Sequence, residues 1–338
     1  MEKLVLVKGS EEQQEQTWKN HYVEWGKGLT LQQHIDRVLF LKTKRIRPTS
    51  IVHARRIDVV SWFLNLIPVD LVEEHDCESV ASVFCPEQYR RRGYASLMLS
   101  LLYKEISPGR GASFLYSDIG TEFYWKSGER EKGGGYKAQP TDMLNLSVDT
   151  KMSAKTEVST SDVQRKDVRA IIERDVTTLR HQLAHGGDIT GDVSDKRVWF
   201  SVVPSIEAIE WLFARTLSNE ERLGKKVEDI WGVQTADGES YALWFYDWPE
   251  DNLVFLRMRL SPSSDRSSVM IRFIQRAMEV AKAQGLERVH VWDPPKDAVR
   301  DAGLDITTRE DHLPSLCLYV HEDMDNVVWM CNEKYAWI

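Results

Sequence analysis

The run from Arg90 to Ser96 combines residue types that proteins use to bind phosphate groups. Gly93 has no side chain, so the backbone can approach a ligand closely there. The small Ala95 and Ser96 stand where a helix is expected to begin, and the free N–H groups and dipole of a helix N-terminus favour an anion. Arginine side chains add charge-assisted hydrogen bonds to the same phosphates. These residue types predict a loop that binds a pyrophosphate carrier. The loop consists of Arg90, Arg91, Arg92, Gly93, Tyr94, Ala95 and Ser96.

Two elements must position this loop. The apolar run Val80–Phe84 predicts a strand that ends just before it, and Ser96–Glu105 predicts an amphipathic helix just after it. So short a pattern gains its value from this placement between a strand and a helix. The alternative is that Arg90–Arg92 is a solvated basic turn in front of an ordinary helix. Another strand, Ser113–Tyr116, and a short helix, Glu122–Lys126, are expected to follow.

The rest of the chain also alternates strands with helices, which is typical of an α/β fold. Residues 148–160 are rich in Ser, Thr and Lys, lack apolar periodicity and predict a linker. We therefore expect two domains, residues 1–147 and residues 161–338, with the same order of element types. The further expected strands are Lys3–Val7, Ser50–Ala54, Val59–Leu66, Val198–Val203, Ile230–Gln234, Tyr241–Asp247, Leu253–Leu260 and Arg288–Trp292. The further expected helices are Glu11–Trp25, Leu29–Leu41, one that starts at a capping box at Ser161–Gln164, Ile206–Thr216 and Ser267–Gln284.

The spacing Arg90-x-x-Gly93-x-Ala95 after an apolar strand resembles the acetyl-CoA signature of the GNAT superfamily of N-acetyltransferases. The resemblance implies a mixed α/β fold, acetyl-CoA as co-substrate, and direct attack by an amine in a ternary complex. It also implies that Tyr124 protonates or hydrogen-bonds the departing thiolate; a packing role is the alternative. A backbone N–H before the loop is then expected to polarise the thioester carbonyl. The residues that could supply it are Val83, Phe84 and Cys85.

The attacking amine must lose a proton. A lysine amine has a reference pKa of about 10.4, so a base or a chain of water molecules is expected. Glu78 is the first candidate, because it stands at the start of the strand that leads into the loop; an exposed carboxylate at a strand end is the alternative. His75 and Asp118 are the other candidates, although Asp118 before Ile119 and Gly120 also suits a turn.

Four segments resemble, more narrowly, the fungal lysine N6-acetyltransferases of lysine catabolism. They are residues 80–95, 116–124, 199–211 and 328–337. The resemblance implies free L-lysine as the acceptor and a degenerate GNAT-like second domain that shapes the acceptor pocket without binding acetyl-CoA. Residues 42–76 depart from the family, which leaves the acceptor open. The alternatives are another small amine, a protein amine, or a non-catalytic scaffold that binds acyl-CoA.

Composition excludes several classes of function. The 338 residues are 42% hydrophobic and 28% charged, as in ordinary globular proteins. A net charge of −8 argues against broad attraction to nucleic acid or anionic lipid, and no stretch reaches membrane-spanning length. The four cysteines lack close pairs and metal-type spacing, so we expect no metal and a cytoplasmic location. His181 and His185 lie one helical turn apart, but Gln182 replaces the glutamate of a zinc protease.

Overall fold

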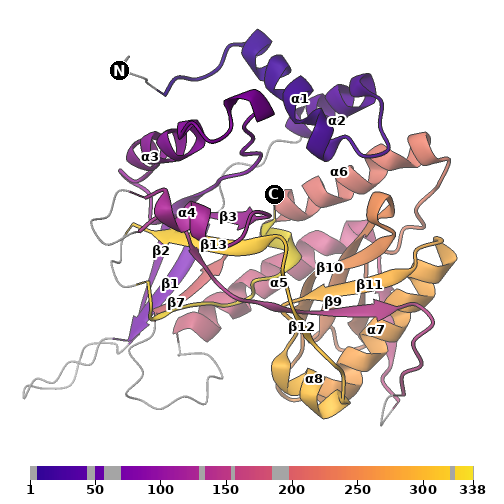
Figure 1. The fold of residues 1–338 in the computed structure, drawn as a ribbon. Helices are drawn as coiled ribbons and strands as arrows, with labels where there is room; N and C mark the ends of the chain where they lie inside the picture. Colours follow the sequence, from indigo (N-terminus) through magenta and orange to yellow (C-terminus); the bar gives the residue numbers. More distant parts are fainter. Residues whose placement is uncertain are drawn as a thin grey trace, which may run out of the picture.

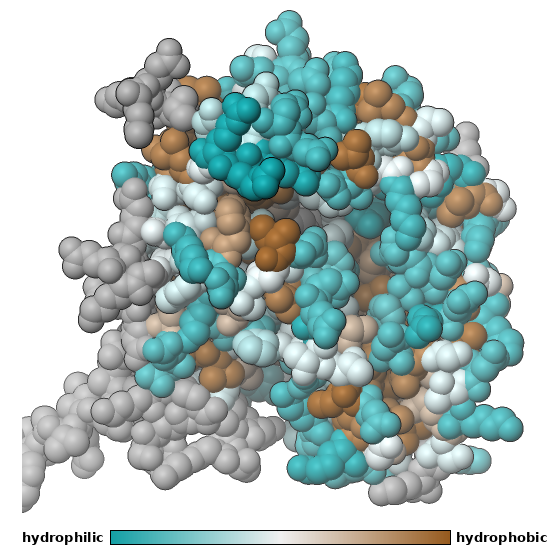
Figure 2. Space-filling view, viewed as in Figure 1, coloured by the Kyte–Doolittle hydropathy of each residue, from teal (hydrophilic) through white to brown (hydrophobic). Residues whose placement is uncertain are grey.

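The computed structural model describes residues 6–43, 50–56, 70–128, 134–153, 157–184, 198–319 and 324–337. In these residues two seven-stranded sheets are surrounded by helices, so the chain has a mixed α/β fold (Figure 1). Helix α5 contacts β1 and β2 of the first sheet and, through Asp175, Arg257 on β10 of the second. Hydrophilic residues cover most of the face shown in Figure 2, and hydrophobic residues form small separate patches there.

The bounds of the elements are as follows. The first sheet runs in the order β14 (Val327–Trp329), β7 (Val198–Val202), β1 (Ser50–Arg56), β2 (Asp70–Ser79), β3 (Ala112–Ser117), β13 (Leu313–Leu318) and β4 (Lys137–Ala138). The second runs in the order β12 (Thr307–Thr308), β5 (Asp142–Ser147), β11 (Arg288–Trp292), β10 (Asn252–Arg259), β9 (Tyr241–Asp247), β8 (Gly232–Thr235) and β6 (Thr160–Val163). The helices are α1 (Glu11–Trp25), α2 (Leu31–Thr43), α3 (Tyr94–Ile106), α4 (Glu122–Lys126), α5 (Arg165–Ala184), α6 (Ile206–Leu223), α7 (Arg266–Ala283) and α8 (Lys296–Ala302), with 3-10 turns η1 (Glu87–Tyr89), η2 (Trp248–Glu250) and η3 (Lys334–Ala336).

Strands from the two parts of the chain are exchanged between the sheets. β5 precedes residue 148, yet it pairs with β11 in the second sheet. β7, β13 and β14 follow residue 160, yet they lie in the first sheet. β13 inserts between β3 and β4, with Leu313 opposite Ser117. The sheets therefore do not divide at residues 148–160, and the proposed domain boundary there stays a prediction.

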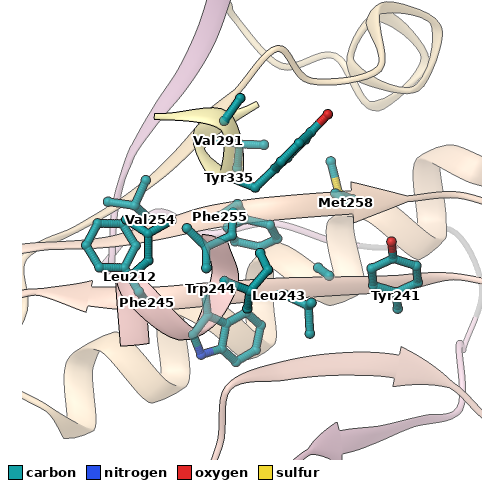
Figure 3. Close-up of a cluster of buried hydrophobic side chains, with 14 of the residues drawn as sticks. Leu212, Tyr241, Leu243, Trp244, Phe245, Val254, Phe255, Met258, Val291 and Tyr335 are labelled. Carbon is teal, nitrogen blue, oxygen red and sulfur yellow. The ribbon is translucent and has the colours of Figure 1, made fainter. Parts of the chain in front are cut away.

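The core is densest where β9 and β10 pair. β9 is an unbroken run of buried residues from Tyr241 to Tyr246, as expected for a strand covered on both faces. Figure 3 shows part of this core, in which Tyr335 of η3 lies near Phe255 of β10. Trp244 is also fully buried here. This packing holds the C-terminal segment against the second sheet.

Most of the expected elements are present, and α1 has the predicted bounds. Two expectations were wrong. Residues 80–84 are not a strand, because β2 ends at Ser79, where it separates from β3. Residues 160–163 pair with β8 as strand β6 instead of ending a linker and capping a helix, and α5 begins at Arg165. The strand expected at 59–66 and most of the one expected at 3–7 lie outside the described residues. Among the described residues, no helix has the length and apolar character needed to cross a membrane.

Candidate active site

β2 and β3 separate just before the predicted phosphate loop. They pair in parallel from Cys77 to Ser79, and a last hydrogen bond runs from Val80 N to Phe114 O at 2.8 Å. Residues 81–86 then leave the sheet. Within the described residues, no hydrogen bond engages the backbone N–H groups of Val83, Phe84 or Cys85. The opening between the strands therefore offers free donors for a polarised carbonyl oxygen.

The loop ends in a helix start that suits an anion. Gly93 is the N-cap residue of α3 and has φ +77°, a left-handed conformation that disfavours any other residue. A Cβ atom at this position would meet nothing within 4 Å, so glycine is required here by conformation and not by crowding. The first bond of the helix runs from Leu97 N to Gly93 O, which leaves the N–H groups of Tyr94, Ala95 and Ser96 pointing out of the helix end.

The three arginines of the loop differ in their surroundings. Arg90 donates from Nε to the Cys85 carbonyl at 2.9 Å and pairs with Glu24 of α1 at 3.3 Å, so it fastens the loop to its neighbours. Arg91 is exposed and has φ 62°, and Arg92 is exposed with its guanidinium 5.9 Å from the Tyr89 ring centroid. Arg91 and Arg92 are therefore the ones best placed to reach a phosphate in solvent.

Tyr124 packs in a small hydrophobic cluster beside the loop helix. Its side chain is buried with Leu99 of α3, Leu115 of β3 and Tyr136. Burial, and then the negative charge of Asp118, raise the pKa of Tyr124 above its ordinary value. The phenol therefore stays protonated at neutral pH and can act as a hydrogen-bond donor or a general acid.

The three candidate bases lie at different places along β3. His75 contacts Gly111, before the start of β3, and Glu78 lies opposite Ser113 near that start. Asp118 follows the far end, on the order of 15 Å further along the strand from Ser113. Only Asp118 of the three influences the pKa of Tyr124.

Both of the carboxylate candidates have a partner. Arg110 donates from Nε to Glu78 at 3.0 Å. Asp118 accepts the backbone N–H of His312 at 3.0 Å and lies 2.8 Å from its Nδ1. Burial alone would raise the pKa of Asp118, but the hydrogen bonds and the charge of His312 outweigh it and lower the pKa. Asp118 can therefore take up a proton only by competing with His312.

His312 introduces residues that sequence patterns did not single out. Its ring stacks on Trp292 at 5.9 Å and meets Trp337 edge-on at 5.8 Å. Arg309 and Lys334 lie over the same Trp292 ring. These residues come from β11, the loop before β13 and η3, about 200 positions after the loop, so no local spacing connects them. The only signal in the sequence was that Lys334 and Trp337 fall in the family-like segment 328–337. No group of three or more potential metal-ligating side chains occurs in the described ranges.

Comparisons with known proteins place the chain in a family. The family described as LYC1 GNAT-like C-terminal domain matches residues 144–338. No curated protein matches the chain. Similar solved structures include a GCN5-related N-acetyltransferase from Anabaena variabilis (13% identity, TM-score 0.41, 73% of this chain and 56% of that one). Another is from Sphaerobacter thermophilus (12% identity, TM-score 0.40, 69% and 70%).

A third similar structure is a GCN5-related glucosamine N-acetyltransferase region of a fungal GH3 β-N-acetylglucosaminidase, with 9% identity, a TM-score of 0.47, and coverage of 90% of this chain and 36% of that one. The chain thus spans little more than half of the Anabaena protein and about a third of the fungal one. The family match, in contrast, covers more than half of the chain. It includes β13, η3 and the residues around Trp292. The chain belongs to the LYC1-like family of GNAT proteins.

Proposed function

We propose that this protein is an N-acetyltransferase that moves an acetyl group from acetyl-CoA to a primary amine, and that the amine is the N6-amine of free L-lysine. One observation carries the proposal. Gly93, in a left-handed conformation and uncrowded by other atoms, is the N-cap of α3 near the point where β2 and β3 separate. The buried Tyr124 packs beside the same helix. The matched GNAT-like family supports acetyl transfer, and the resemblance of four segments to fungal lysine N6-acetyltransferases supports lysine as the acceptor.

Different residues of the site are proposed to act in different steps of a direct transfer of the acetyl group. The first-turn N–H groups of α3, with Arg91 and Arg92, would hold the pyrophosphate of acetyl-CoA. A free backbone N–H among residues 83–85 would receive the charge that develops on the thioester oxygen. The amine would attack the carbonyl carbon, the bond to sulfur would break, and Tyr124 would give a hydrogen bond or a proton to the thiolate.

The base is proposed to be Asp118, Glu78 or a water held by one of them. Asp118 has the stronger support, because its charge influences the pKa of Tyr124. Residues after 160 are proposed to shape the acceptor pocket, in line with the contribution of β13 and η3 to this region. A cytoplasmic location is proposed from the four free cysteines, Cys77, Cys85, Cys317 and Cys331.

Release of free CoA thiol over a panel of amines tests the function. The panel contains L-lysine, 1,5-diaminopentane, spermidine, glucosamine and a peptide with a free N-terminus. We expect thiol release with L-lysine and identification of N6-acetyllysine by mass spectrometry. Turnover with a different amine would keep the acetyltransferase and replace the acceptor. Binding of acetyl-CoA without turnover of any amine would refute the enzyme and favour an acyl-CoA-binding scaffold.

A further inference from the structure

Two cations share the faces of two tryptophan rings near the end of β3. The Arg309 guanidinium carbon lies 3.6 Å from the Trp292 ring centroid. The Lys334 Nζ lies 4.0 Å from the same centroid and 3.7 Å from that of Trp337. Arg309 is 3% exposed and Lys334 5% exposed, so both charges are largely removed from water. We call Arg309, Lys334, Trp292 and Trp337 the cation cluster.

Neither cation has a carboxylate partner in the part of the chain that the structure describes. Arg309 donates from Nη2 to the carbonyl of His312, but its Nε and Nη1 are buried and find no acceptor among the described residues. Lys334 is in no ion pair with any described carboxylate and relies on the two aromatic faces. A cation–π contact supplies only about 0.5 to 2 kcal/mol, whereas burying an unpaired charge is far more costly.

Burial disfavours the charged forms of both Arg309 and Lys334, and this effect appears in their pKa values. Burial lowers the pKa of Arg309 to about 10 and lowers the pKa of Lys334 well below its ordinary value. Buried charges in proteins are normally in direct ion pairs. Here Asp247 attracts Lys334 and Asp311 attracts Arg309 through their charge, without an ion-pair contact, so both cations keep room for a closer anion. The neighbouring Tyr116 hydroxyl and Asn332 carbonyl oxygen are buried without hydrogen-bond partners among the described residues as well. Such a group of unsatisfied polar atoms is typical of a ligand site.

The cation cluster is connected to the reaction centre. Trp292 stacks on His312, and His312 contacts Asp118. The charge of Asp118 in turn reaches Tyr124. His312 is about one-third exposed, so the cluster borders solvent on the side that faces Asp118. An acceptor anchored at the cluster could therefore extend its amine past Asp118 toward Tyr124.

We propose that Arg309 and Lys334 bind a carboxylate of the acceptor beside the Trp292 ring, so that the enzyme selects amines that carry a carboxylate at their far end. This inference rests on the proposed function and extends it by naming the residues that recognise the acceptor. Arg309 offers two free N–H donors from one planar guanidinium and Lys334 a second positive charge, which is the donor set that a carboxylate requires.

Three amines with a similar carbon chain separate recognition of the carboxylate from recognition of the rest of the acceptor. L-Lysine and 6-aminohexanoate both carry a carboxylate, whereas 1,5-diaminopentane is lysine without it. We expect the wild-type protein to prefer both carboxylate compounds. In Arg309→Gln and in Lys334→Met, KM for the carboxylate compounds should rise by roughly 10- to 100-fold, the usual effect of losing a charged hydrogen bond. Values of kcat/KM for 1,5-diaminopentane should change by less than about threefold.

The matched control is Arg300→Gln, which removes an exposed arginine of α8 whose ion-pair partner among the described residues is its neighbour Asp301. It should leave all three substrates unaffected. Circular dichroism and thermal unfolding verify that each variant is folded, and Arg309→Lys, which keeps the charge but loses the planar fork, should show an intermediate KM. A wild-type preference for 1,5-diaminopentane, or equal losses for all three amines in Arg309→Gln and Lys334→Met, would overturn the inference.

A binding experiment keeps this inference separate from the proposed function. L-Norleucine has the carboxylate of lysine but no side-chain amine to be acetylated. Its binding can therefore be measured by calorimetric titration without any turnover. Binding to the wild type that is lost in Arg309→Gln supports the carboxylate site even if no amine is acetylated. Turnover of L-lysine with unchanged norleucine affinity in Arg309→Gln would refute the carboxylate site and leave the acetyltransferase intact.

Discussion

At the scale of single residues, the site combines groups whose roles follow from their surroundings. Tyr124 is kept protonated by burial and by the charge of Asp118, which suits a proton donor. Asp118 is kept ionised by His312, which suits a group that orients an amine or accepts a proton. The two residues were candidates from the sequence, Tyr124 through the resemblance to GNAT enzymes and Asp118 as one of three possible bases. Their partner His312 was not, because its backbone N–H reaches Asp118 only after β13 has paired with β3.

Replacement of Tyr124 by phenylalanine tests its chemical role. The ring would keep its packing against Leu99 and Leu115, so the free energy of unfolding should change little. Loss of the hydroxyl should lower kcat by about 100-fold or more, the usual size of an acid–base contribution, with KM for acetyl-CoA nearly unchanged. Thiol release under saturating substrates measures kcat. A control is Tyr89→Phe, which alters an exposed tyrosine that precedes the loop. Unchanged kcat in Tyr124→Phe would assign this residue to packing alone.

At the scale of elements, the sequence predicted the loop and the helix start around Gly93 because the evidence for them is local, and phosphate binding there stays a prediction. A glycine, small residues and a helix start lie within seven positions, and the structure places Gly93 at the N-cap of α3. The strand before the loop was predicted at residues 80–84, beyond the end of β2 at Ser79, because apolar residues resemble a strand whether or not a neighbour pairs with them. β5 and β13 were not predicted, since short strands in the middle of a sheet are defined by distant partners.

A matched pair of glycines separates the function of the loop from backbone strain. Gly93 and Gly109, near the two ends of α3, both have φ +77°, and an alanine methyl group at either position would meet nothing within 4 Å. Alanine at either position should lower stability by about 1 to 2 kcal/mol, because a left-handed conformation is costly for it. Only Gly93→Ala should also weaken acetyl-CoA binding, by about tenfold, as measured by calorimetry. Equal affinities in the two variants would argue against pyrophosphate binding at this helix start.

At the scale of the whole molecule, a buried ionic network joins the parts that the exchanged strands bring together. Arg257 of β10 donates from Nε to Asp175 of α5 at 2.8 Å, and its Nη1 contacts Glu333, next to Lys334 of η3. Glu333 also accepts the N–H of Met258 at 2.6 Å. Long-range pairing of this kind leaves no trace in sequence periodicity, since the three charged residues are separated by more than 70 positions. The network holds the segment that carries the cation cluster.

This network predicts how stability depends on pH. Two buried carboxylates share one guanidinium, so the network carries an excess negative charge, and burial raises the pKa of Glu333 from 4.5 to about 7. Because the folded state binds this proton more tightly, the contribution of Glu333 to stability is complete below pH 4.5 and is lost as pH rises through 7. Glu333→Gln imitates the protonated form and has no such loss.

The free energy of unfolding of Glu333→Gln minus that of wild type should therefore be larger at pH 8 than at pH 5, by on the order of 1 to 3 kcal/mol, because only the wild type loses stability as pH rises. Chemical denaturation at the two pH values measures this change. Glu287→Gln, at an exposed position before β11, serves as the control and should show no difference between them. A relative stability of Glu333→Gln that stays constant from pH 5 to pH 8 would mean that Arg257 keeps Glu333 ionised throughout, and that the network holds η3 equally firmly across this range.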